Sequence, residues 1–127
     1  GATKFVEIRV INALTEEVAV QAGKAVANSS LVKTAINGED ANWGRILAAV
    51  GNSGVEFDPE AVEISFGDVP ILRKGYRIDF SEEDAKRVLS QKEIQITVDL
   101  SQGVASAAFW TCDLSKDYVA INANYRT

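Results

Sequence analysis

The sequence predicts an α+β fold in which helices pack on one face of a mainly antiparallel sheet. Several short segments alternate apolar and polar residues, which is the pattern of half-buried strands, and most are joined by short turns. Blocks with apolar residues at helical spacing stand between them. The chain has 127 residues, of which 46% are apolar, enough for one hydrophobic core. We therefore expect a single domain over residues 1–127.

Period-two alternation places the strands. Strands are predicted over Lys4–Val10, Val62–Phe66, Val69–Arg73, Tyr76–Ile78, Ile94–Asp99 and Ala105–Cys112. Gly67-Asp68 is typical of a hairpin turn. Pro70 predicts that its strand lies at a sheet edge, because proline has no N–H to donate to a neighbour. The last two strands are expected to pair with each other through the turn Ser101–Gly103.

Apolar spacing and capping residues place the helices. Helices are predicted from Thr15 to about Asn28, over Leu31–Ile36, over residues 42–50, and from Ser81 to Leu89. Asp40 precedes the third helix as its expected cap, and Asn37-Gly38 is expected to end the second in a left-handed conformation. Ser81 with Asp84 three residues later is a variant of the capping box.

Composition excludes several classes of function. The chain has 13 Lys+Arg against 18 Asp+Glu, a formal charge of -5, so nucleic acid and anionic membranes are poor partners. No apolar run approaches the ~20 residues that span a bilayer. The lone Cys112 has no partner for an internal disulfide, and no signal peptide is evident, so we expect a cytoplasmic protein. There is no histidine, the commonest general base and metal ligand.

Three short patterns suggest chemistry, but each has a simpler interpretation. The loop Gly51–Gly54 follows a helix and lacks the lysine of a phosphate cradle. The acidic runs Glu39-Asp40 and Glu82–Asp84 lie where helices begin, and negative charge is favourable there without a metal. Cys112 ends an apolar strand and has no histidine to activate it, so a buried small side chain is favoured over a nucleophile. The sequence predicts no metal or cofactor site.

Two polar segments remain open to interpretation. The string Asp40–Arg45 places an amide, an indole and a guanidinium around a glycine, which can present donors to a ligand or tie a loop to the rest of the protein. We favour the structural interpretation. The C-terminal residues Tyr118–Tyr125 are rich in aromatic and amide side chains and suit either a helix or a strand.

Five short motifs are spread over the chain. They are Gly1-Ala2-Thr3-Lys4, Ser30-Leu31-Val32-Lys33-Thr34-Ala35, Gly38-Glu39-Asp40-Ala41-Asn42-Trp43-Gly44-Arg45, Cys112-Asp113-Leu114 and Ile121-Asn122-Ala123-Asn124-Tyr125-Arg126-Thr127. In this order they resemble the ornithine acetyltransferase family, also called bifunctional glutamate N-acetyltransferases of arginine biosynthesis. The resemblance runs from the first residue to the last. The visible departure is Ala41, where the family commonly has proline.

The resemblance implies acetyl transfer from N-acetylornithine to glutamate, and in some members from acetyl-CoA, through an acetyl-threonine intermediate. It also implies a precursor that cuts itself at an Ala-Thr bond to free the nucleophilic threonine. Ala2-Thr3 matches a later family segment, so the nucleophile and an active-site glutamate are expected outside this chain. We therefore expect the C-terminal region of the β chain, with no catalytic residue and no cofactor. Its partners would be the remainder of the β chain and the α chain.

The resemblance also implies two substrate-binding residues, Asn122 and Thr127, which match the asparagine and threonine of the family's closing motif. An amide and a hydroxyl both donate and accept hydrogen bonds, which suits an amino-acid substrate with ammonium and carboxylate groups. The alternative is that these side chains only hold the C-terminal segment in place. A non-catalytic assembly or interaction module is the alternative for the whole chain.

Overall fold

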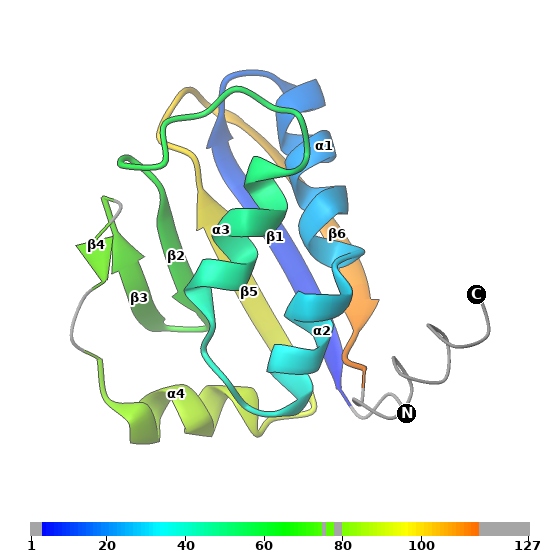
Figure 1. Cartoon of the computed structure of the whole chain (residues 1–127), viewed down its shortest axis with the longest axis vertical. Helices are drawn as coiled ribbons and strands as arrows, with labels where there is room; N and C mark the ends of the chain where they lie inside the picture. The colour runs from blue at the N-terminus through cyan, green and yellow to red at the C-terminus, as the bar shows by residue number, and fades with distance from the viewer. Residues whose placement is uncertain (1–3, 75, 78–79, 115–127) are drawn as a thin grey trace.

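A mixed sheet with helices on one face forms the framework of the chain (Figure 1). The computed structural model describes residues 4–74, 76–77 and 80–114. Its strands are β1 (Phe5–Ala13), β2 (Glu63–Phe66), β3 (Val69–Arg73), β4 (Tyr76–Arg77), β5 (Glu93–Asp99) and β6 (Ala105–Cys112). Their order across the sheet is β4-β3-β2-β5-β1-β6. The pair β1 and β5 is parallel and the other pairs are antiparallel, which confirms the predicted mainly antiparallel α+β fold.

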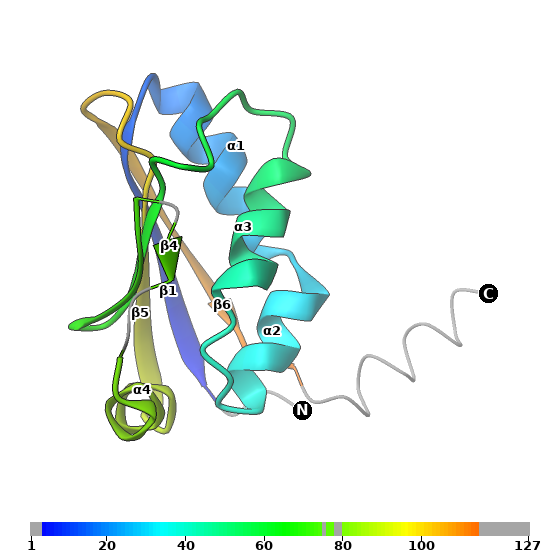
Figure 2. The same ribbon diagram turned by 60° about the vertical axis from the view of Figure 1, so that its left-hand side comes forward.

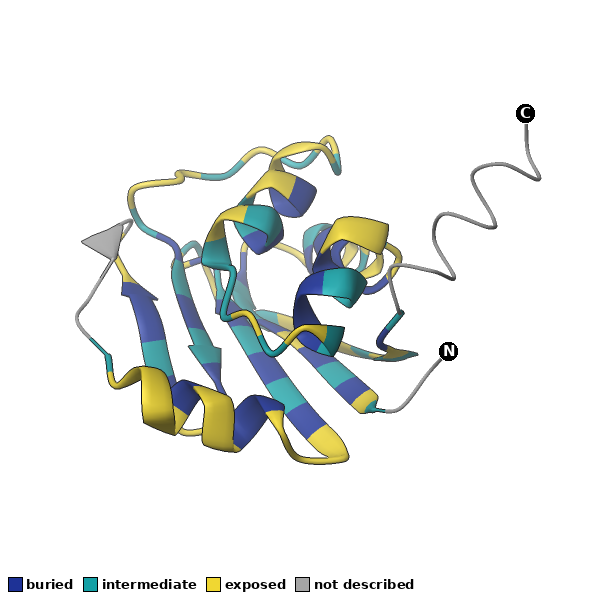
Figure 3. Ribbon diagram, turned by 60° about the horizontal axis from the view of Figure 1, so that its bottom comes forward, coloured by how far each residue is buried: buried dark blue, intermediate teal, exposed yellow. Residues whose placement is uncertain are grey.

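Three helices cover one face of the sheet, as Figure 2 shows. They are α1 (Glu16–Ala27), α2 (Ser30–Asn37) and α3 (Trp43–Gly51). The fourth helix, α4 (Glu82–Leu89), lies across one end of the sheet, against β2 and β3. Burial alternates along the strands (Figure 3), because every second side chain points into the layer between sheet and helices. On β1 the buried side chains are Val6, Ile8, Val10 and Ala13, and the first three form the face that the alternation predicted.

Each helix begins at a polar residue whose side-chain oxygen accepts a hydrogen bond from the N–H three positions later. These residues are Thr15, Ser29, Asn42 and Ser81, with N···O distances of 3.2, 3.2, 3.0 and 3.1 Å. The third cap is therefore Asn42 and not Asp40, which lies too early and instead accepts from the Asn42 amide at 3.1 Å. The left-handed residue after α2 is also not the predicted one: Gly38 has φ -82° and Glu39 has φ 55°.

The predicted hairpin between the last two strands is wrong, because β1 lies between β5 and β6 and pairs with both. The segment Ser101–Gly103 crosses the end of β1 instead. There the backbone N–H groups of Gln102 and Gly103 donate to the Asn12 carbonyl at 2.8 and 3.0 Å. A Cβ atom on Gly103 would lie 2.6 Å from the carbonyl oxygen of Ala13, so this crossing requires glycine.

The prediction that Pro70 marks an edge strand is also wrong, because β4 pairs with β3 on its far side at Leu72 and Arg73. Pro70 lies opposite Ser65, next to a shift in register that brings Leu72 opposite Ile64. An irregularity of this kind accommodates a residue that has no N–H to donate.

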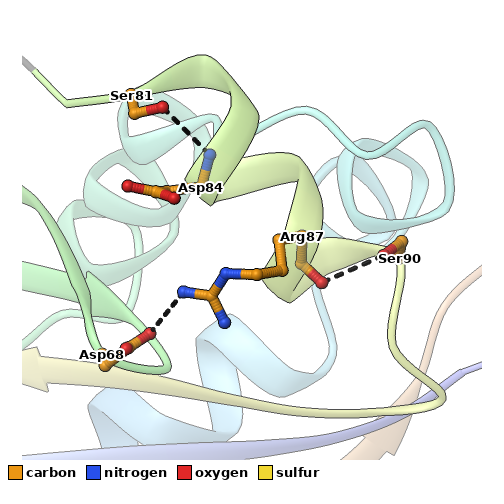
Figure 4. Close-up of polar contacts among 5 residues, drawn as sticks. All are labelled: Asp68, Ser81, Asp84, Arg87 and Ser90. Carbon is orange, nitrogen blue, oxygen red and sulfur yellow. Dashed lines mark hydrogen bonds and ion pairs between the residues drawn. The ribbon is translucent and has the colours of Figure 1, made fainter.

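Helix α4 is attached to the turn between β2 and β3 (Figure 4). The Arg87 guanidinium lies 3.1 Å from the Asp68 carboxylate, but both side chains are exposed, so this ion pair adds little stability. The backbone of the turn also approaches α4 at Val88. Gly67 has φ 57°, and a Cβ atom there would lie 3.1 Å from a methyl carbon of Val88. The N-cap bond of Ser81 fixes where the helix starts.

We expect Gly23→Ala to destabilise the protein, because a Cβ atom on Gly23 of α1 would lie 2.6 Å from two ring carbons of Phe109. Overpacking of this kind costs about 1–3 kcal/mol. The matched control is Gly51→Ala at the end of α3, where no atom lies within 4 Å of the added Cβ. The control should be neutral or stabilising by up to about 1 kcal/mol, because alanine favours helix. Chemical denaturation of both variants measures the difference, and equal midpoints would contradict the tight contact.

Candidate functional site

The predicted substrate contacts Asn122 and Thr127 lie outside the residues that the structure describes, as does the conformation of Tyr118–Tyr125. The structure does describe the place from which the chain runs toward them. Leu114 follows β6 at the end of the sheet where β1 begins, because β1 and β6 are antiparallel and Phe5 pairs with Cys112. Among the described residues, those at this end of the sheet therefore include the ones nearest in sequence to the predicted contacts.

A buried carboxylate holds this end together. Asp113 is 0% exposed, and no other charged side chain among the described residues is classed as buried. Its Oδ1 accepts a hydrogen bond from the Lys4 backbone N–H at 2.7 Å, and its Oδ2 accepts from the Asn37 side-chain amide at 2.7 Å. The Lys4 ammonium donates to the Ile36 carbonyl at 3.2 Å. Asp113, Lys4 and Asn37, here called the Asp113 cluster, thus join β6, β1 and α2.

Backbone bonds extend the same junction. The Asp113 N–H donates to the Lys4 carbonyl at 3.3 Å, and the Leu114 N–H donates to the Lys33 carbonyl at 3.2 Å. Sequence reasoning missed this cluster, although Asp113 belongs to one of the quoted motifs. The available signal was an acidic residue directly after an apolar strand, which is also common in exposed turns.

The string Asp40–Arg45 makes structural contacts. The Arg45 guanidinium of α3 donates to the Leu31 carbonyl at 2.9 Å and to the Thr34 hydroxyl at 3.3 Å, and both acceptors belong to α2. Trp43 is partly buried against the core. These contacts agree with the favoured interpretation that the string ties two elements together.

A hollow of about 320 Å³ lies beside this string, and Phe80 and Glu82 at the start of α4 complete its lining. The string lines it with Asp40–Gly44. The Asp40 and Glu82 carboxylates are acceptors for hydrogen bonds, so the lining suits a cationic group better than an anion. Asn37 ends α2 and Asp40 lies in the loop that follows, so neighbouring residues contribute to the Asp113 cluster and to this hollow.

The structure also places two other patterns from the sequence, the loop Gly51–Gly54 and Cys112. Ser53, in the loop Gly51–Gly54, accepts a hydrogen bond at its carbonyl from the Gln21 side chain at 2.6 Å, so the loop is tied to α1. Cys112 is exposed, and the predicted burial is wrong. Alternate residues of β6 face the helices, and Phe109 is among them, so Cys112 lies on the opposite face.

Two kinds of feature are absent from the part of the chain that the structure describes. Within residues 4–74, 76–77 and 80–114, no group of three or more His, Cys, Asp or Glu side chains is arranged to hold a metal ion. Over the same ranges, no helix is long and apolar enough to cross a membrane.

The face of the sheet opposite the helices carries large apolar side chains that are exposed to solvent. Phe5 is 50% exposed and Trp110 is 56% exposed. They line a hollow of about 350 Å³ together with Glu7, Glu93 and Gln95. The Gln95 amide donates to the Glu7 carboxylate at 2.9 Å and so holds the polar rim in place. Exposed apolar groups with a polar rim are typical of a surface that another protein surface covers.

Comparison with known proteins agrees with the resemblance seen in the sequence. The profile of the ArgJ family matches residues 1–127. The chain is 54% identical over 127 residues to the arginine biosynthesis bifunctional protein ArgJ of Chlorobium chlorochromatii, and 56% identical over 131 residues to that of Caldanaerobacter subterraneus subsp. tengcongensis. These matches cover 100% of this chain and 30% and 32% of the two relatives.

A solved structure is also similar. The crystal structure of the arginine biosynthesis bifunctional protein ArgJ from Bacillus halodurans superimposes with a TM-score of 0.90 at 43% identity, over 98% of this chain and 59% of that one. The chain thus spans about a third of the length of its curated relatives, and its predicted C-terminal position within that length stays a prediction. The match of the profile to all 127 residues shows that the chain belongs to the ArgJ family.

Proposed function

We propose that the chain is a non-catalytic segment of an enzyme that transfers acetyl from N-acetylornithine to glutamate. The observation that carries this proposal is the match of the family over the whole chain. In the proposed reaction a threonine hydroxyl outside the chain attacks the acetyl carbonyl, the C–N bond breaks, and ornithine leaves with the proton. The glutamate amine then attacks the ester, the C–O bond breaks, and the hydroxyl is restored. The segment supplies scaffold and, through Asn122 and Thr127, part of the substrate pocket.

Processing of a precursor into two chains is part of this proposal. The chain covers 59% of the solved Bacillus halodurans chain but 30% of the Chlorobium chlorochromatii relative. The solved chain is therefore about half as long as that relative. A precursor cut into two chains of similar length accounts for this difference, which supports processing into two chains without locating the cut.

The partner we propose is the remainder of the same protein. Some two thirds of the length of the curated relatives lies outside the matched part. That remainder is available to cover the exposed face around Phe5 and Trp110. Glu93 on the rim suits a cationic group opposite it, whereas Glu7 already pairs with Arg9 at 3.3 Å. The exposed thiol of Cys112 suits the reducing cytoplasm. An assembly module without enzymatic activity would use the same face, so an activity assay distinguishes the two functions.

The isolated chain should not catalyse acetyl transfer. It contains no histidine, and the proposed nucleophile lies outside it. Incubation of the purified chain with N-acetylornithine and glutamate should give no N-acetylglutamate above background. The full-length processed protein, assayed in parallel, should form it. Turnover by the chain after rigorous removal of full-length enzyme would refute this expectation, and an inactive full-length protein would favour the assembly module.

Trp110→Thr should destabilise the full-length protein by about 1 kcal/mol or more, because burying a large apolar side chain that is half exposed in this chain contributes about that much. Threonine keeps the strand propensity of the position. The matched control is Val104→Thr, at an exposed apolar residue in a loop. It should change stability by less than about 0.5 kcal/mol. Thermal unfolding that does not separate the two variants would mean that the face is not covered.

Asn122→Ala in the intact processed enzyme should lower kcat/KM for N-acetylornithine by roughly five- to a hundred-and-fiftyfold. Loss of one hydrogen bond in a desolvated pocket costs about 1–3 kcal/mol, and about 1.4 kcal/mol is a factor of ten. Thr127→Ala should have a smaller effect in the same direction, because a hydroxyl has one donor hydrogen whereas an amide has two. Steady-state kinetics measure the loss.

A gel of the same preparation provides the control for this pair of variants. Both processed chains should be present, because cleavage does not need bound substrate. Normal processing with wild-type kinetics in Asn122→Ala would mean that the residue has only a structural role.

A further inference from the structure

We propose that Asp113 is a positioning residue for the substrate contacts: its carboxylate fixes the point from which the chain runs on toward Asn122 and Thr127. The inference rests on the proposed function, since it assumes that these two residues meet the substrate. Asp113 itself is not assigned any contact with substrate.

The geometry of the Asp113 cluster carries the proposal. The two carboxylate oxygens accept from two different parts of the fold, the Lys4 backbone directly before β1 and the Asn37 side chain of α2, both at 2.7 Å. A side chain with one acceptor oxygen cannot satisfy both donors in this way. The carboxylate therefore sets the orientation of three elements at once, and the backbone bond from Leu114 to Lys33 continues that constraint beyond β6.

Burial gives the cluster its rigidity. Asp113 is completely buried, and a buried carboxylate must keep its hydrogen bonds because water cannot replace them. Apolar packing of similar volume often stabilises a protein as well as a buried charge does, but it does not specify one orientation. The role of the carboxylate is to hold the elements that it joins in one orientation. Such accuracy matters because a misplacement of about 1 Å in an active site can lower the rate by about a hundredfold.

The sheet supplies a matched control at its opposite end. There the Asp99 carboxylate accepts a hydrogen bond from the Ser101 backbone N–H at 2.8 Å, much as Asp113 accepts from Lys4. This bond joins residues two positions apart in an exposed turn, whereas the Asp113 bonds join residues 76 and 109 positions apart. Asp99→Asn thus makes the same chemical change without loosening the junction.

The test compares Asp113→Asn with Asp99→Asn in the full-length processed protein. Asp113→Asn should lower kcat/KM for N-acetylornithine by about ten- to a hundredfold, mainly through KM, and Asp99→Asn should match wild type. A double-mutant cycle identifies the route. If Asp113 acts through Asn122 and Thr127, adding Asp113→Asn to the double variant Asn122→Ala/Thr127→Ala should change KM by less than about threefold. Fully multiplicative effects would overturn the proposal, because a general structural defect does not depend on these two residues.

Two further measurements test the proposal if Asp113→Asn does not fold or is not processed, or without an activity assay. Should Asp113→Asn fail to process or fold, Asn37→Ala removes only one donor and should raise KM in the same direction, but less; an unchanged KM would overturn the proposal. Hydrogen exchange over residues 114–127, followed by mass spectrometry, does not depend on activity. Faster exchange in Asp113→Asn but not in Asp99→Asn supports the proposal, and equal exchange refutes it. A wild-type protein that transfers no acetyl group refutes the proposed function instead.

Discussion

The position of β1 between β5 and β6 determines where the two ends of the described chain meet. The inward side chains of β1 are fully buried, and its two edges pair in opposite senses, parallel to β5 and antiparallel to β6. Antiparallel pairing brings the start of β1 beside the end of β6, so Lys4 and Asp113 meet although 109 positions separate them. Both ends of the described chain therefore leave the sheet at one place, where a single buried carboxylate can hold them.

The same arrangement divides the sheet into two faces with different roles. Three helices bury one face, and this layer accounts for a core that includes Ile8, Phe66 and Ile96. The other face exposes Phe5 and Trp110 beside charged residues. A sheet with helices on one face has the hydrophobic core that folding requires. Its other face still exposes apolar side chains that a second surface can cover. This is the arrangement expected of a scaffold whose second layer and reactive groups come from elsewhere in the same protein.

Local patterns predicted the elements well, and long-range contacts explain what those patterns missed. The alternation in Ile94–Asp99 identified β5 because each strand buries one face, but alternation does not name the partner strand. The turn at Ser101–Gly103 is compatible with a hairpin and with a crossing over β1, and only the core decides between them. Asp113 was missed for the same reason, because its burial depends on Asn37, 76 positions away. The proposed contacts Asn122 and Thr127 came from a family motif and stay predictions.

A scaffold that contributes no reactive group can still control a reaction through the accuracy with which it places other residues. Hydrogen bonds suit this role because they are directional, whereas apolar contacts tolerate sliding and rotation. In the Asp113 cluster the directional bonds lie at the boundary between the rigid sheet and the residues that follow Leu114. A loss of orientation at that boundary would affect everything downstream of it while leaving the core of β1, β5 and the helices intact. Under the proposed role, the apolar layer contributes mainly to stability, and the buried carboxylate of Asp113 contributes mainly to the orientation of the elements that it joins.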